Sequence, residues 1–246
     1  MSRITVVTSG KGGAGKSTVS AGLGYALAKA GASVLLVDGD AGLRGLDLML
    51  GIGQDMVFDL GDIFAGHCEP IRAVYRSPFS ENLSLLPAPS ALSGLCSPSE
   101  LRRLCRGFAK HYDFVFIDCP AGTGPGFDMA VGAAETALVV STPDAICARD
   151  AGVVADLLEE RDIPARLVIN RLRVTPVLQG KMPDLDTIID TAGLQLIGVI
   201  PEDEQLVVSA ANGRPMPDRG VAHTCFRNIA RRFCGEDVPL MALHKL

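Results

Sequence analysis

The sequence predicts a doubly wound α/β fold, in which helices cover both faces of a mostly parallel β-sheet. Short runs rich in Val, Leu and Ile recur along the chain, and most of them are continuously apolar, as in strands that are buried on both faces. Stretches with helical periodicity separate these runs. Alternation of strand and helix is typical of parallel sheets with right-handed crossovers.

The expected strands are 4–8, 33–38, 83–87, 114–118, 137–141, 165–170 and 196–201. The expected helices are 17–30, 99–109, 151–160 and 185–192. A stretch rich in Pro and Ser, 77–99, is interpreted as surface loops around one strand and not as a linker between domains. We therefore expect one domain over residues 1–235, followed by a short tail over residues 236–246.

The composition argues against several classes of protein. Among the 246 residues, 48% are hydrophobic, yet no apolar run reaches the roughly 18–20 residues that a bilayer requires. No signal peptide is recognisable, so a cytoplasmic location is expected. The net charge of −5 does not favour general binding to nucleic acids. The seven cysteines contain no C-x-x-C pair, and we interpret them as small, reduced core residues.

A glycine-rich loop follows the first expected strand and precedes the first expected helix. It satisfies the pattern G-x-x-x-x-G-K-[ST] at Gly10, Gly15, Lys16 and Ser17. Backbone N–H groups of such a loop surround phosphate oxygens, Lys16 is expected to reach the β- and γ-phosphates, and Ser17 is expected to bind Mg²⁺. The residues expected to bind nucleotide here are Gly10, Lys11, Gly12, Gly13, Ala14, Gly15, Lys16, Ser17 and Thr18.

Three acidic residues follow expected strands. Asp118 ends the apolar run 114–117 and is expected to hold Mg²⁺ through water. Asp38 and Asp40 follow the second strand, where a carboxylate can orient the attacking water and accept its proton, or assist in metal binding. Alternatively, both acids only cap the turn that follows. We assign Asp40 to catalysis, and Asp38, Asp40, Asp118 and Ser17 to the metal site.

A second lysine in the loop, Lys11, gives the pattern K-G-G-x-G-K-[ST]. This pattern resembles the deviant Walker A family of P-loop NTPases (the SIMIBI type), which includes the MinD and ParA ATPases. The segments 38–47, 118–122 and 199–203 are most similar to the MinD group, and the likeness extends over residues 4–235. The resemblance implies that the chain binds ATP or ADP with Mg²⁺ and dimerises across ATP, with Lys11 touching the partner's phosphates. The expected catalytic residues are therefore Lys11, Lys16 and Asp40.

The resemblance also implies a function and partners. It implies an ATP hydrolase that is slow without an activator and that serves division-site placement or a related positioning process. Regulators of the MinC or MinE type are the implied partners. Asn170 and Arg171, after one late strand, and Pro201 and Asp203, after another, correspond to the family's adenine-binding segments. The pair Arg149–Asp150 is either a surface that faces a partner or simply the N-terminus of a helix.

Two alternative functions stay open at this point. A ParA-like partition ATPase that binds nucleoid DNA needs a basic surface, which the acidic composition disfavours. The other alternative is a soluble MinD-like adaptor with another partner. An iron–sulfur carrier normally shows a C-x-x-C pair, which this chain lacks, and the presence of Asp40 and Asp118 argues against a scaffold that only binds ATP.

The remaining predictions concern mobility and the membrane. Glycines at 122, 124 and 126 are expected to leave the segment after Asp118 free to rearrange around the γ-phosphate. The amphipathic stretch 224–234 fits an interfacial helix or a final helix that covers the core, and we favour the second interpretation. The tail 236–246 contains one lysine and a proline, so weak or no direct membrane binding is expected.

Overall fold

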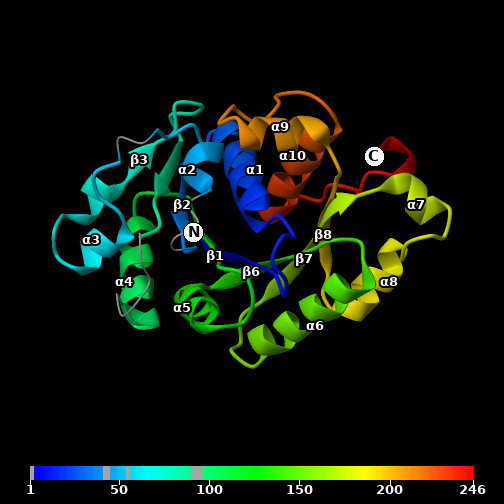
Figure 1. Cartoon of the computed structure of the whole chain (residues 1–246), viewed down its shortest axis with the longest axis horizontal. Coiled ribbons are helices and arrows are strands. Elements are labelled where there is room, and N and C mark those ends of the chain that lie inside the picture. The colour runs from blue at the N-terminus through cyan, green and yellow to red at the C-terminus, as the bar shows by residue number, and fades with distance from the viewer. Residues whose placement is uncertain (1–2, 41–44, 54–55, 90–95) are drawn as a thin grey trace.

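An eight-stranded sheet with helices on both faces forms the protein, and this confirms the predicted fold class (Figure 1). The structure is a computed structural model that describes residues 3–40, 45–53, 56–89 and 96–246. The strands are β1 (Arg3–Thr8), β2 (Val34–Asp38), β3 (Tyr75–Arg76), β4 (Leu83–Leu86), β5 (Phe114–Asp118), β6 (Thr136–Ser141), β7 (Ala165–Leu172) and β8 (Leu196–Pro201).

The strand order is β3-β4-β2-β5-β1-β6-β7-β8. All neighbouring pairs are parallel except β3 and β4, which pair antiparallel at one edge. The seven predicted strands are confirmed, and the bounds of β5 and β8 agree with the prediction. Strand β3 was not predicted, since two residues are too few to give a periodic signal. The carboxyl ends of β1, β2 and β5 meet at the centre of the sheet.

The helices are α1 (Lys16–Lys29), α2 (Leu46–Met49), α3 (Leu60–Phe64), α4 (Pro98–Phe108), α5 (Pro125–Ala133), α6 (Ala145–Glu159), α7 (Val174–Leu178), α8 (Leu185–Ala192), α9 (Glu204–Ala211) and α10 (Val221–Phe233), with 3₁₀ turns η1 (Pro70–Ala73) and η2 (Leu243–Lys245). Figure 1 shows α1, α2, α9 and α10 over one face of the sheet, and α4, α5, α6 and α8 over the other. The two faces accordingly carry two separate apolar cores.

The short helices α2, α3, α7 and α9 were not predicted, and helices α5 and α6 differ from the prediction for local reasons. Helix α6 begins at Ala145, earlier than the predicted 151, because the carboxylate of Asp144 accepts a hydrogen bond from the backbone N–H of Cys147 and caps the helix. Helix α5 was not predicted, since glycine has a low helix propensity, and it places Gly126 inside a regular turn. A Cβ on Gly126 would lie 2.8 Å from Cγ of Pro120, so this glycine permits close packing. Rearrangement of the segment that contains Gly122, Gly124 and Gly126 around a γ-phosphate stays a prediction.

The final helix, α10, covers the core, as we favoured from the sequence. Phe226, Ile229 and Phe233 are buried on one of its faces, and the ring of Phe233 lies 5.5 Å from that of Phe116 on β5. Burial of each such ring contributes about 2–3 kcal/mol. Helix α1 packs closely against α10, since a Cβ on Gly22 would lie 2.4 Å from the ring of Phe226. These contacts fix the helix that follows the glycine-rich loop.

The tail folds back onto the body of the protein. The guanidinium of Arg232 donates hydrogen bonds to the backbone oxygens of Val238 and Pro239, at 2.7 Å each, and to that of Ile197 at 2.9 Å. Leu243 and Leu246 then pack, partly buried, against one of the two apolar cores. In the described parts of the chain, every helix is too short or too polar to span a membrane.

Candidate functional site

The glycine-rich loop joins β1 to α1 and presents a helix N-terminus. Gly13 and Gly15 have φ values of 84° and 90°, in the left-handed region that favours glycine. Gly15 is the N-cap of α1 and has no side chain that could accept a hydrogen bond from the first turn, and no acidic residue lies in that turn. The first backbone N–H groups of α1 and the positive end of its dipole are therefore available to an anion.

The two lysines of the loop differ sharply in their surroundings. Lys16 is 8% exposed, and its Nζ donates a 3.3 Å hydrogen bond to Oγ of Ser9. The Ser9 hydroxyl in turn donates to the backbone oxygen of Lys11 at 2.8 Å, which ties the start of the loop to its centre. The side chain of Lys11 is exposed. Lys16 is thus held at the loop, whereas Lys11 extends outward, and Ser17 and Thr18 occupy the first turn of α1.

Asp38 and Asp118 end neighbouring parallel strands and are register partners. Both are 2% exposed. Burial, and after it the charge of the nearby Asp118, together raise the pKa of Asp38 to about 7. Burial likewise raises the pKa of Asp118 to about 6, although hydrogen bonds from Ser17 and Ser20 oppose the change. Two buried acids this close favour a divalent cation, which compensates both charges.

The oxygen donors around Asp118 suit Mg²⁺. The Ser17 hydroxyl donates to Asp118 Oδ2 at 2.5 Å, and the Ser20 hydroxyl donates to Oδ1 at 2.9 Å. Oxygen ligands without histidine or thiolate are those that Mg²⁺ prefers. Among the described residues, no cluster of three His, Cys, Asp or Glu side chains is preformed as a metal cage. The arrangement therefore fits an ion held by one or two protein groups together with phosphates and water.

Asp40 is half-buried and lies next to Asp38. Its backbone N–H donates to Oδ1 of Asp38 at 3.0 Å, and the N–H of Gly39 donates to the backbone oxygen of Asp118 at 3.0 Å. Burial raises the pKa of Asp40, while the charge of Lys16 lowers it. Asp40 is thus partly exposed and close to Lys16, as a water-orienting carboxylate must be. Within the segment 38–47, residues 41–44 lie outside the described residues, whereas Leu46 and Asp47 begin α2.

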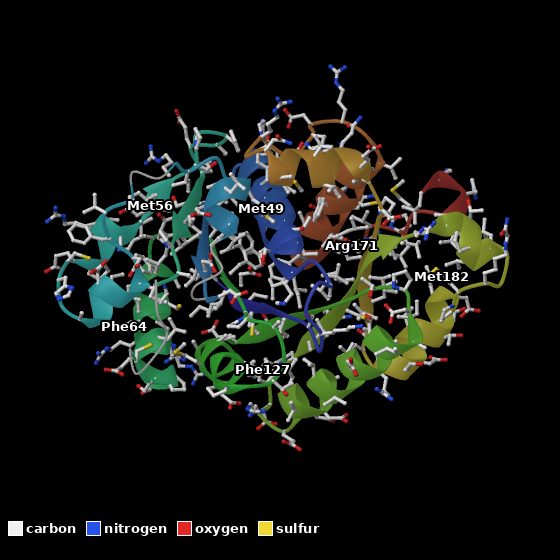
Figure 2. All side chains as sticks on the ribbon, viewed as in Figure 1. Met49, Met56, Phe64, Phe127, Arg171 and Met182 are labelled. Atoms are coloured by element: carbon white, nitrogen blue, oxygen red, sulfur yellow. The ribbon has the colours of Figure 1, made fainter. Side chains whose placement is uncertain are left out.

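The four residues that were expected to bind adenine make different contacts in the structure. Asn170 is 3% exposed, and its Nδ2 donates to the backbone oxygen of Ala14 at 2.9 Å. Arg171 follows at φ 56° and is exposed near the end of β7 (Figure 2). Pro201 ends β8 and is buried, whereas Asp203 caps α9 by accepting from the N–H groups of residues 205 and 206. A role in adenine binding stays a prediction for all four.

Arg149 and Asp150 lie within α6 and not at its N-terminus, so that alternative is wrong. Arg149 is exposed and pairs with Asp150 at 3.7 Å. The backbone of Asp150 also packs against the loop, since a Cβ on Gly10 would lie 2.3 Å from its oxygen. Sequence reasoning missed this contact. It also missed Ser20, which helical periodicity places one turn after Ser17 and on the same face of α1.

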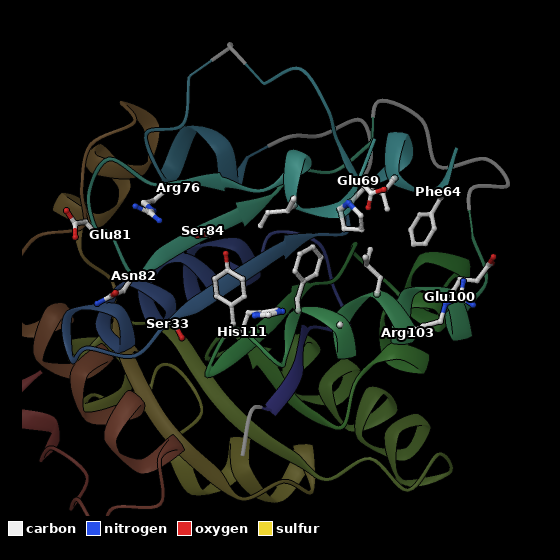
Figure 3. Close-up of a pocket in the computed structure, with 17 residues that line it drawn as sticks. Ser33, Phe64, Glu69, Arg76, Glu81, Asn82, Ser84, Glu100, Arg103 and His111 are labelled. Atoms are coloured by element: carbon white, nitrogen blue, oxygen red, sulfur yellow. The ribbon is translucent and has the colours of Figure 1, made fainter. Parts of the chain in front are cut away.

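A cavity of about 980 Å³ lies away from these residues, between α3, η1 and α4 (Figure 3). Its lining combines apolar side chains such as Phe64 and Phe108 with charged groups of both signs, including Arg103, Glu69 and Glu100. None of its lining residues comes from the glycine-rich loop or from the strand ends that carry the buried acids. The cavity is therefore distinct from the candidate nucleotide site.

Comparison with known proteins identifies close relatives. Residues 5–216 match the family model of the CobQ/CobB/MinD/ParA nucleotide binding domain. The septum site-determining protein MinD of Synechocystis sp. is 40% identical over 98% of this chain and 92% of that protein. The MinD of Bacillus subtilis is 38% identical over 100% of this chain and 94% of that protein.

Solved structures give the same result. The MinC:MinD cell division protein complex of Aquifex aeolicus superposes with a TM-score of 0.91 at 35% identity, covering 98% of each chain. The septum site-determining protein MinD of Pyrococcus horikoshii, complexed with Mg-ADP, superposes with a TM-score of 0.85 at 30% identity, covering 95% of this chain and 96% of that one.

Proposed function

The chain belongs to the CobQ/CobB/MinD/ParA nucleotide-binding family, and we propose that it is a MinD-type, Mg²⁺-dependent ATPase that acts in division-site placement. One observation carries the proposal. The uncapped N-terminus of α1, with the buried Lys16, lies beside two buried acids, Asp38 and Asp118, at adjacent strand ends. This arrangement has the charges that a nucleoside triphosphate with Mg²⁺ requires, and a relative is known with Mg-ADP.

Each group at the site has a distinct task in hydrolysis. The loop N–H groups and the ammonium of Lys16 bind the β- and γ-phosphates. Ser17 and Asp118 would hold Mg²⁺, which would supply positive charge against the phosphates, and Asp38 would support this site. Asp40 orients a water toward the γ-phosphorus and accepts its proton as a P–O bond forms. The bond from that phosphorus to the β–γ bridging oxygen breaks, which leaves ADP and phosphate.

A homodimer that encloses ATP is the second part of the proposal. Lys11 is exposed beside a loop whose other lysine is held in place, so it is free to reach the phosphates of a second copy. The ATP form is then a dimer and the ADP form a monomer. Hydrolysis is slow until a regulator acts, and the dimer is the form that regulators recognise.

A MinC-type protein is the proposed partner, since a related MinD from Aquifex aeolicus is known in complex with MinC. The outer face of α6 offers a surface for it. Ile146 and Val153 are 55% and 52% exposed on this helix, and Arg149 lies between them. Residues spaced by three, four and seven positions share one face of a helix, so the three form a continuous stripe. Binding to DNA is not part of the proposal.

The location of the protein follows from its tail in this proposal. The protein acts in the cytoplasm, at or near the inner face of the membrane, and binds lipid weakly by itself. The packing of Leu243 and Leu246 against the core supports weak binding, because both side chains are already partly buried, although Leu240 is 51% exposed. Sedimentation with anionic liposomes, with ATP or ADP, tests this on the full chain and on a chain ending at Gly235. ATP-dependent pelleting that is lost on truncation would contradict weak binding.

Phosphate release and mass measurement in solution test the enzyme and the dimer. Asp40→Ala and Lys16→Ala should abolish hydrolysis, while Asp190→Asn, on the exposed face of α8, should leave it unchanged. Lys11→Ala should remove the ATP-dependent dimer, while Lys110→Ala, an exposed lysine after α4, should keep it. Unchanged phosphate release by Asp40→Ala would remove Asp40 from the mechanism, and a dimer of the Lys11→Ala protein would remove Lys11 from the interface.

A further inference from the structure

Asn170 makes a buried contact with the glycine-rich loop that its predicted role at the adenine does not require. Its Nδ2 donates to the backbone oxygen of Ala14 at 2.9 Å, and both residues are 3% exposed. The amide is also in close contact with Gly15, the next residue of the loop, since a Cβ on Gly15 would lie 2.3 Å from Nδ2. A hydrogen bond that water does not reach is costly to leave unmade.

The direction of this bond fixes the direction of a loop N–H group. In a trans peptide, the C=O and the N–H of one unit point to opposite sides. The structure contains no cis peptide among its described residues, so the oxygen of Ala14 and the N–H of Gly15 point in opposite directions. Because Asn170 holds the oxygen on the side of β7, the N–H of Gly15 points away from β7, toward the centre of the loop. That side is where phosphate oxygens bind.

An irregularity in β7 places the amide at the loop. Between Ile169 and Leu172 the register with β8 shifts, and β7 contains one residue more than β8 over this interval. Arg171, within the interval, has a φ of 56°. An extra residue of this kind bends a strand and changes the direction of its side chains. Asn170 therefore points to Ala14 from a bulge, at the same edge as the ends of β2 and β5.

We propose that Asn170 is a positioning residue for the phosphate-binding loop, acting through the backbone oxygen of Ala14. The inference rests on the proposed function, because it assigns Asn170 a second role at the same nucleotide site. The amide keeps one N–H and its oxygen for the base, so a single side chain links the base to the loop. Loss of the link leaves the N–H of Gly15 unfixed, which weakens binding of the phosphates whatever base is attached.

The test separates the phosphates from the base. Magnesium tripolyphosphate, which has no base, is titrated by calorimetry into the wild type, Asn170→Ala and a control, Asn82→Ala. The control removes a hydrogen bond of the same kind, which Nδ2 of Asn82 donates to the backbone oxygen of Ala28 at the far end of α1. We expect Asn170→Ala to weaken tripolyphosphate binding about ten- to a hundredfold, which is the value of one hydrogen bond from the N–H of Gly15 to a charged phosphate oxygen. Asn82→Ala should leave tripolyphosphate binding unchanged.

A second variant excludes a merely structural effect. In Asn170→Asp, the ionised carboxylate faces the oxygen of Ala14 and cannot donate, whereas the protonated acid can donate. At about pH 5.5 the protonated Asn170→Asp protein should bind tripolyphosphate more tightly than Asn170→Ala, because loss of the carboxylate charge alone would only bring the two variants to equal affinity. An affinity of Asn170→Asp that stays at or below that of Asn170→Ala at about pH 5.5 would overturn the proposal. So would unchanged tripolyphosphate affinity of Asn170→Ala with weakened Mg-ATP affinity, which would confine Asn170 to the base. A wild type that does not hydrolyse ATP would overturn only the proposed function, since tripolyphosphate binding is measured independently.

Discussion

Replacement of Asp38 by asparagine should make the nucleotide-free protein more stable, by an amount that grows with pH. Asp38 is 2% exposed at the end of β2, and its Oδ1 accepts a hydrogen bond from the N–H of Asp40 at 3.0 Å. Asparagine has the same shape and can accept the same hydrogen bond through its own Oδ1. The substitution therefore removes a titratable buried acid beside Asp118 with little change in packing.

The magnitude follows from the pKa of Asp38, which burial and the neighbouring Asp118 raise from 3.8 to about 7. The unfolded chain ionises this group near its ordinary pKa, whereas the folded chain keeps it protonated until the pH approaches 7. The unfolded state thus releases a proton that the folded state retains, and stability falls as the pH rises between the two values. From about pH 5.5 to about pH 8, the wild type loses about 2 kcal/mol through this group, and Asp38→Asn does not.

Urea unfolding in the presence of EDTA and without nucleotide measures this difference. We expect the stability gained by Asp38→Asn to be about 2 kcal/mol larger at about pH 8 than at about pH 5.5. Asp118 titrates in both proteins, so its contribution largely cancels. Asp190→Asn, an exposed acid on α8, serves as the control and should give the same small change at both pH values. An equal gain from Asp38→Asn at both pH values would refute the reasoning.

Two further predictions concern the loop and the metal site. Gly10→Ala should weaken ADP binding at least about tenfold by calorimetry, because the new Cβ would lie 2.3 Å from the backbone oxygen of Asp150. In the control, Gly12→Ala, the nearest atom to the new Cβ is 3.6 Å away, so ADP should bind nearly normally. Equal ADP affinities of the two variants would contradict this prediction. Ser17→Ala should raise the Mg²⁺ concentration for half-maximal phosphate release about tenfold or more, since it removes the hydroxyl that contacts Asp118 at 2.5 Å; an unchanged Mg²⁺ requirement would exclude Ser17 from the metal site.

The sequence was most informative where a signal is local. Continuous apolar runs predicted β5 and β8 with correct bounds, because strands buried on both faces need little more than apolar side chains. The glycine-rich loop was predicted from its pattern between a strand and a helix. Helix α5 was missed because Gly126 and Gly132 lower its helix propensity, whereas in the structure they allow close approach to Pro120 and Pro98. Tertiary packing decided against local propensity there.

Contacts between distant parts of the chain could not be predicted in the same way. The hydrogen bond from Ser20 to Asp118 depends on the angle at which α1 crosses β5, and the sequence does not give that angle. The bond from Asn170 to Ala14 joins residues 156 positions apart and depends on the bulge in β7. A motif marks Asn170 as a residue of the site. Only the sheet order, which places β7 two strands away from β1, shows which backbone atom it reaches.

The buried acids show why this site has to be less stable without its ligand. The parallel register that pairs β2 with β5 places Asp38 directly beside Asp118, so the sheet that supplies the core also holds two like groups together away from water. Their raised pKa values mean that ionisation of either acid is less favourable in the folded chain than in the unfolded chain. A divalent cation reverses this preference, because it stabilises the ionised forms. Binding of Mg-nucleotide therefore stabilises the fold at the point where the empty site weakens it, and the occupancy of the site and the stability of the central strands are coupled.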